Sequence, residues 1–159
     1  MKKLSALIAL ALFAIPTAYA QDGSSCAASI PLAAGTVNTD TSTGTGWINN
    51  YGPLASPSND ITYTFTTGAS APTGNLNPTA SSYAFALYLL NSCTAGAGPT
   101  PIGATATIGT PISLTTLNPS TQYWVAVTGT AAGGPNANGT LTWDANPTLP
   151  VTLQSFEIN

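Results

Sequence analysis

The chain has 159 residues, of which only 4% are charged, and it contains no histidine. Its two basic residues, Lys2 and Lys3, both lie at the extreme N-terminus. Binding to nucleic acid and electrostatic attachment to anionic lipid both depend on Lys and Arg, so this composition argues against both functions.

The first twenty residues have the order of a secretory signal peptide. A basic start, "MKK", is followed by the apolar segment "LSALIALALFAI", by Pro16 and by the small residues Ala18 and Ala20. The apolar segment is shorter than the roughly 20 residues that span a bilayer. We therefore expect cleavage after Ala20 and a secreted, extracellular or cell-surface chain without a membrane-inserted part.

The remaining chain shows the period-two alternation of β-strands and no helical periodicity. The clearest strand candidates are residues 60–68, 83–90, 121–129 and 139–145, and weaker ones are 29–38, 102–109, 111–117 and 150–158. Gly, Pro, Asn and Ser dominate the segments between them, as in turns and loops. This pattern predicts an all-β fold, a single antiparallel β-sandwich or jelly-roll-like domain over residues 21–146. Residues 147–159 then form a last strand or a junction tail.

Alternation also predicts which side chains face the core. Residues predicted to face inward are Ile61, Tyr63, Phe65, Tyr83, Phe85, Leu87, Leu89, Tyr123, Val125, Val127, Leu141 and Trp143. In the segment 83–90 the opposite face is apolar as well, so this strand is expected to be central or covered on both sides.

A local signature precedes the strand at 121–129. In "LTTLNPSTQYW" a Leu and a proline turn lead to Tyr123, the pattern of a tyrosine corner. In that motif the tyrosine hydroxyl bonds a backbone group a few residues upstream. An ordinary turn into a strand is the alternative interpretation.

The two cysteines, Cys26 and Cys93, lie far apart in the chain. A thiol nucleophile needs a base, usually His, and metal sites need clustered ligands, and this chain offers neither. Secretion leads to an oxidising compartment, so we expect a Cys26–Cys93 disulfide that ties the strand ending near Cys93 to the start of the domain.

Six segments resemble the bacterial pre-peptidase C-terminal domain, in the order in which they occur there. They are "SSCAASIPLAAGTVNTDT", "GWINNYGP", "NDITYTFTTG", "FALYLLNSCT", "ISLTTLNPSTQYWVAVTGT" and "NGTLTW". The resemblance implies a small β-sandwich secreted by bacteria as an accessory to a larger enzyme or surface protein. Some members of that family bind collagen, calcium or polysaccharide. The Leu-x-Pro-x-Thr-x-Tyr element also occurs in fibronectin type III domains, which are the alternative fold.

Few residues offer catalytic or metal chemistry. Glycosidases use paired carboxylates, but the five acidic residues are scattered along the chain, so we expect no enzymatic activity. Asp60 stands directly before the alternating residues of a predicted strand, where it is expected to cap a turn. No cofactor is expected except calcium, at low affinity, with Asp40 and Asp60 as carboxylate ligands in the loops that flank "GWINNYG".

Two functions fit this sequence. The first is a non-catalytic module for extracellular adhesion or polymer recognition, with the aromatic side chains of Trp47 and Tyr51 as the candidate binding surface. The second is a structural subunit that assembles with itself into a filament or surface layer. Charged side chains on edge strands hinder pairing with another chain, and this chain has few of them. The expected partner is an extracellular polymer or protein, or a second copy.

Overall fold

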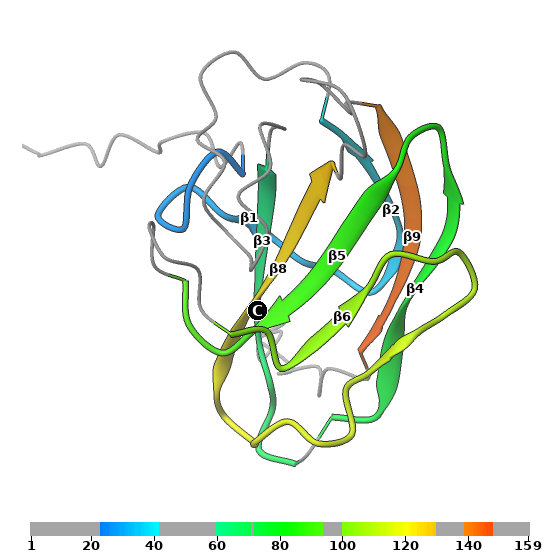
Figure 1. The fold of residues 1–159 in the computed structure, drawn as a ribbon. Coiled ribbons are helices and arrows are strands. Elements are labelled where there is room, and N and C mark those ends of the chain that lie inside the picture. The colour runs from blue at the N-terminus through cyan, green and yellow to red at the C-terminus, as the bar shows by residue number, and fades with distance from the viewer. Residues whose placement is uncertain (1–22, 42–59, 71, 94–99, 130–138, 148–159) are drawn as a thin grey trace, which may run out of the picture.

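The computed structural model describes residues 23–41, 60–70, 72–93, 100–129 and 139–147. These residues form nine strands and no helix (Figure 1). The strands are β1 (Ile30–Pro31), β2 (Gly35–Asp40), β3 (Asp60–Thr66), β4 (Gly74–Ser81), β5 (Phe85–Leu90), β6 (Gly103–Thr105), β7 (Ile112–Ser113), β8 (Gln122–Gly129) and β9 (Thr140–Pro147).

The strands form two sheets that pack face to face as a β-sandwich (Figure 1). One sheet has the order β1-β3-β8-β5-β6 and the other has the order β2-β9-β4-β7. All described pairs are antiparallel except β1 with β3, which is parallel. The predicted all-β sandwich is thereby confirmed.

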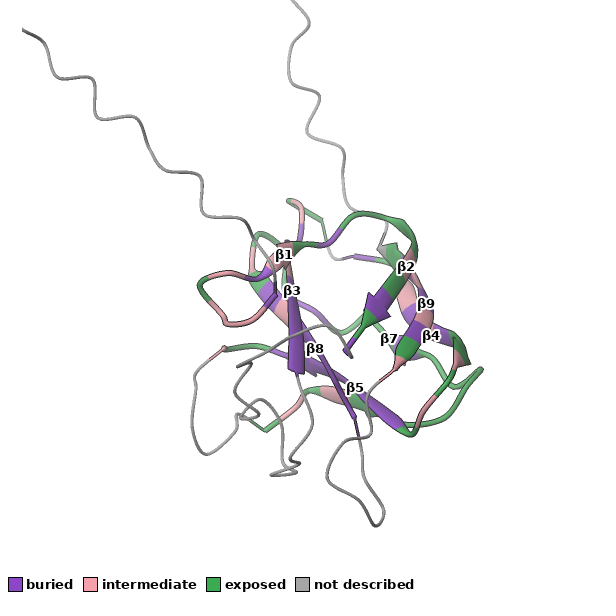
Figure 2. Cartoon of the chain, turned by 90° about the horizontal axis from the view of Figure 1, so that it is seen from above, coloured by how far each residue is buried: buried purple, intermediate pink, exposed green. Residues whose placement is uncertain are grey.

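One core lies between the two sheets. It contains the inward-facing residues predicted from alternation, with Tyr83 packed against it. The strands β3, β8 and β5 are largely buried along their length (Figure 2). Its fully buried members come from both sheets: Leu87, Val125 and Val127 from the five-stranded sheet, and Leu76, Leu141 and Trp143 from the four-stranded one. Burial of such side chains stabilises the fold by roughly 1.5–3 kcal/mol each.

A small polar network joins the sheets inside this core. The Trp143 Nε1–H donates to Thr39 Oγ1 over 2.9 Å, and Thr39 Oγ1 lies 2.7 Å from the Tyr63 hydroxyl oxygen. The rings of Tyr63 and Trp143 meet edge to face, with their centroids 5.4 Å apart. Because buried polar groups are costly without partners, this network holds β2, β3 and β9 in one arrangement.

The five-stranded sheet is also apolar on its outer face. Ala86, Tyr88 and Leu90 of β5 and Ala126 of β8 form a second buried cluster, against which Trp124 packs. The expectation that the segment 83–90 is covered on both sides is confirmed for these β5 residues.

The predicted tyrosine corner is present. The backbone N–H of Asn118 donates to the Tyr123 hydroxyl over 2.9 Å, across the proline turn. The ring of Tyr123 stacks on Phe65 of the neighbouring strand, with centroids 5.9 Å apart. The hydroxyl is therefore committed to holding the turn that leads into β8.

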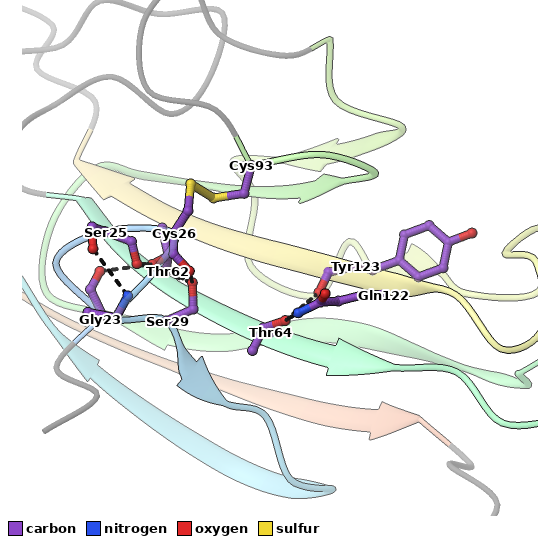
Figure 3. The surroundings of a disulfide bond; sticks show 10 residues. Gly23, Ser25, Cys26, Ser29, Thr62, Thr64, Cys93, Gln122 and Tyr123 are labelled. Carbon is purple, nitrogen blue, oxygen red and sulfur yellow. Dashed lines mark hydrogen bonds between the residues drawn. A yellow bond between two sulfur atoms is a disulfide. The ribbon is translucent and has the colours of Figure 1, made fainter. Parts of the chain in front are cut away.

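The predicted Cys26–Cys93 disulfide is formed, with the two Cα atoms 5.6 Å apart. Cys26 lies in the segment before β1, over β3, while Cys93 follows β5, so the bond spans the outer face of β8 between them (Figure 3). The segment is also fastened to Thr62 of β3, whose Oγ1 donates to the Ser25 carbonyl over 2.9 Å and whose N–H donates to the Gly23 carbonyl over 2.8 Å. The start of the domain is thus held to the sheet by a covalent bond and by hydrogen bonds.

Candidate functional site

Two segments outside the described residues, 42–59 and 130–138, have their ends at the same end of the sandwich. We define this region as the anchor end, formed by Thr41, Asp60, Tyr83, Gly129 and Gly139. The N–H of Thr41 donates to the Gly139 carbonyl over 2.9 Å, and the N–H of Gly139 donates to Thr41 Oγ1 over 3.1 Å. These bonds join the start of one segment to the end of the other.

The five-stranded sheet contributes the other two ends of these segments. Asp60 opens β3 opposite Thr128 of β8, and Gly129 closes β8 opposite Phe85 of β5. Both segments are therefore anchored to strands of the rigid core at each end.

The turn between β4 and β5 completes the anchor end. The N–H of Tyr83 donates to Ser81 Oγ over 3.2 Å, which shapes this turn. Gly139 packs so closely here that a Cβ at its position would lie 2.9 Å from Tyr83 Cδ1 and 2.5 Å from Ser82 Oγ. A glycine at position 139 is thus required for the Tyr83 ring and the Ser82 hydroxyl to approach the start of β9.

The Tyr83 hydroxyl oxygen is buried and makes no hydrogen bond of good geometry. Burial is the main cause that raises the pKa of Tyr83 to about 12. The polar side chain of Thr41 nearby lowers this pKa, and the negative charges of Tyr63, Asp40 and Asp60 raise it. Burial, with a contribution from Asp60, also raises the pKa of Tyr88. The hydroxyl of Tyr83 is accordingly neutral at physiological pH and suited to hydrogen bonding, not to acid–base chemistry.

Asp40 and Asp60, the predicted calcium ligands, both lie near the Tyr83 hydroxyl, close enough for their charges to raise its pKa. Their predicted placement in loops is wrong, because Asp40 is the last residue of β2 and Asp60 is the first residue of β3. Asp40 is exposed, whereas only 1% of the surface of Asp60 is exposed. The backbone of Asp60 pairs with Thr128 within the sheet, and the expectation that its side chain caps a turn stays a prediction.

Other predicted site residues are not placed. Trp47 and Tyr51 lie outside the described residues. Within the described ranges, no group of three or more His, Cys, Asp or Glu residues could hold a metal ion. In the same part of the chain, no helix has the length and apolar character needed to cross a membrane.

The sequence did not predict a groove of about 380 Å³ along one open side of the sandwich. It lies between β1 and β2, and its apolar lining includes Ile30, Leu32, Val37 and Tyr63. The single strand candidate 29–38 was wrong here: its residues form two strands, one in each sheet. The chain leaves β1 at Leu32, whose N–H donates to Thr64 of β3, and enters the other sheet at Gly35, whose φ is 131°. A proline at position 31 and a glycine at position 35 were the available signals for this break.

No family model, curated protein or solved structure matches this chain.

Proposed function

We propose that this protein is a secreted, non-catalytic β-sandwich module that recognises an extracellular polymer or protein through the segments held at its anchor end. The observation that carries the proposal is the convergence of both ends of segments 42–59 and 130–138 on one end of a rigid core. Binding residues concentrate on loops that a rigid scaffold positions, because loops tolerate variation that a core does not. The segment 42–59 contains Trp47 and Tyr51, whose rings suit stacking on sugars or on protein.

Further support comes from the disulfide, from the N-terminal segment and from the fold. The disulfide is typical of an oxidising compartment, and the segment 1–20 has the order of a signal peptide. The sandwich fold agrees with the architecture implied by the resemblance to pre-peptidase C-terminal domains. Membership of that family is part of the proposal.

The test is binding of the mature protein, residues 21–159, to insoluble cellulose, chitin and collagen in pull-down assays. We expect retention on at least one of them, lost in Trp47→Ala and Tyr51→Ala with the melting temperature nearly unchanged. Trp124→Ala is the matched control, since its side chain packs against the outer apolar cluster: it is expected to lower the melting temperature and leave binding intact. If Trp47→Ala and Tyr51→Ala melt far lower instead, these rings are core residues and the proposed binding surface is wrong.

Calcium at Asp40 and Asp60 is a subsidiary proposal, supported by the positions of the two carboxylates at the anchor end, where β2 ends and β3 begins. Two carboxylates correspond to the weak sites of extracellular modules, with Kd values of about 10⁻⁴–10⁻³ M. We expect 10 mM CaCl₂, but not 10 mM MgCl₂, to raise the melting temperature, and Asp40→Asn to abolish the increase. Equal effects of the two salts would rule the site out.

A second candidate function is self-assembly, favoured by the open edge of β2. This six-residue strand lies at the edge of its sheet and carries no Lys, Arg or Pro, the residues that commonly protect edges from strand-to-strand association. Size-exclusion chromatography and negative-stain microscopy of the mature protein test this function directly. A monomer at every concentration would exclude it.

A further inference from the structure

We propose that the edge of β2 accepts residues 151–154 of a second copy of this chain as an added strand. The inference rests on the second proposed function, self-assembly, and names the contact that would produce it. Four observations carry it: the length of the edge, its backbone, the groove beside it and the pattern of the tail.

β2 is the longest edge strand that the structure describes. The other edges are β1, β6 and β7, with two, three and two residues, whereas β2 has six. Short edges offer little for another strand to pair with. If a strand is added to the described sheets, β2 is therefore the edge on which it gains the most backbone hydrogen bonds.

The backbone of β2 has hydrogen-bonding groups that point away from the sheet. The N–H of Thr41 donates to Gly139, and the β2–β9 register runs without interruption from Gly35–Ala145 to Asp40–Thr140. In an antiparallel ladder alternate residues bond the same neighbour, so Val37 and Thr39 bond β9. The N–H and C=O groups of Thr36 and Asn38 consequently face outward, where an added strand would find them.

The groove beside β2 provides space for the side chains of such a strand. An added strand places every second side chain on the inner side of the sheet, which at this edge is the apolar groove lined by Ile30, Leu32, Val37 and Tyr63. The opposite side of the sandwich is closed: a Cβ at Gly103 of β6 would lie 2.5 Å from Ile112 Cγ2 of β7. Only the β1–β2 side has this combination of an open edge and an adjacent apolar groove within the described residues.

Residues 151–154, "VTLQ", match this site in pattern. Val151 and Leu153 fall on one face of an extended strand, and Thr152 and Gln154 fall on the other. With the first pair in the groove, the second pair joins the exposed polar row of Thr36 and Asn38 on the outer face. Apolar side chains thus meet the apolar groove, and polar side chains stay in water.

The direction of β9 favours a tail from a second copy over the chain's own tail. β9 ends at Pro147, two residues past the position opposite Gly35, so residue 151 is reached after only three more residues. The chain from Pro147 to residue 151 would have to reverse and cross two strand spacings, about 9.6 Å. Its four residue steps span at most about 14 Å when fully extended, which leaves little length for the turn. A second copy has no such restriction.

The experiment compares two pairs of variants of the mature chain by sedimentation velocity over a range of concentrations. Asn38→Pro removes an outward N–H while leaving the bonds to β9, and its control Asn38→Ala loses the same side chain, including its bond from Thr142, but keeps the N–H. Leu153→Ser removes the proposed groove-filling side chain, and its control Gln154→Ser changes the outward neighbour. We expect Asn38→Pro and Leu153→Ser to weaken association at least tenfold, and each control to associate as the unaltered protein does.

Mixing the two defective variants gives the decisive result. Asn38→Pro retains an intact tail and Leu153→Ser retains an intact edge, so together they should form a one-to-one heterodimer that neither forms alone. Association that persists in both variants, or a mixture that stays monomeric, would overturn the strand-addition proposal and leave self-assembly by another surface standing. A monomeric unaltered protein would overturn both.

A soluble peptide of residues 147–159 provides a second measurement, should circular dichroism show that Asn38→Pro fails to fold. The peptide must inhibit association of the unaltered protein, and the same peptide with Leu153→Ser must not.

Discussion

Cys26 and Cys93 are joined across the outer face of β8, so that the first described segment of the chain is fixed to the residues that follow β5. Cross-linking two such distant positions lowers the entropy of the unfolded chain, by roughly 4 kcal/mol of folding free energy in the chain-entropy treatment. Both cysteines are half-buried and pack against the second cluster, so the bond also covers part of the apolar outer face of the sheet.

The double variant Cys26→Ser, Cys93→Ser is therefore expected to lose up to about 4 kcal/mol of stability, measured by urea denaturation. Reduction of the unaltered protein should have a similar effect. Before reduction, mass spectrometry after alkylation should show no modified thiol. Two alkylated cysteines in the native protein would contradict the disulfide.

Thr39→Val is expected to destabilise the fold by roughly 2–5 kcal/mol, because it leaves both the Tyr63 hydroxyl and the Trp143 Nε1–H buried without their partner. Thr36→Val is the matched control on the same strand. Its hydroxyl bonds Asp144 on the exposed face, over 2.8 Å, so its loss should change stability by less than about 0.5 kcal/mol. Equal effects of the two substitutions on urea denaturation would show that the core network does not contribute as described.

Tyr123→Phe is expected to cost about 1 kcal/mol, since it removes the acceptor for the Asn118 N–H and leaves the ring packing on Phe65 in place. Thermal denaturation measures the change. Gln122→Ala, at the exposed neighbouring position, removes a bond to Thr64 Oγ1 on the surface and should cost much less. An unchanged melting temperature in Tyr123→Phe would mean that the tyrosine corner is energetically neutral here.

The pKa of Tyr83 predicts a loss of stability at alkaline pH. Its folded-state pKa, about 12, lies above the ordinary value of 10.0, so the neutral hydroxyl is favoured in the folded state. Stability is then fully present below pH 10 and falls as the pH rises through 12, because the unfolded chain ionises first. Beyond residue 20 the chain has no Lys or Arg, so tyrosines are the only side chains that titrate in this range once the disulfide is formed.

Tyr83→Phe should therefore reduce the loss of stability between pH 10 and 12, measured by thermal denaturation at fixed ionic strength. Tyrosine ionisation followed by ultraviolet absorbance should show one group fewer among those with a raised pKa, leaving Tyr63 and Tyr88. A variant with the same alkaline profile as the unaltered protein would show that Tyr83 does not ionise later than an ordinary tyrosine.

Residue order alone predicted the strands β3, β5, β8 and β9 and their faces, but it did not predict β4, because that segment is rich in the Gly, Asn, Pro and Ser of loops. Ile61, Tyr63 and Phe65 alternate with threonines, and a period of two fixes which side chains share a face whatever the strand's neighbours are. The tyrosine corner was predictable for a similar reason, as Asn118 and Tyr123 are only five residues apart. The disulfide was predictable because the chain has just two cysteines.

Only the tertiary structure decided how the strands are distributed. Residues 29–38 have one weak strand pattern, yet β1 and β2 belong to different sheets, because the hydrogen bonds of β1 go to β3 and those of β2 go to β9. These partners are distant in the chain, and no local pattern specifies them. The same non-local pairing buries Asp60, joins Thr41 to Gly139 at the anchor end, and leaves the edge of β2 open beside its groove. The alternation of apolar and polar residues identifies the two faces of a strand, but the packing of the whole sandwich decides which strands pair with it on either side.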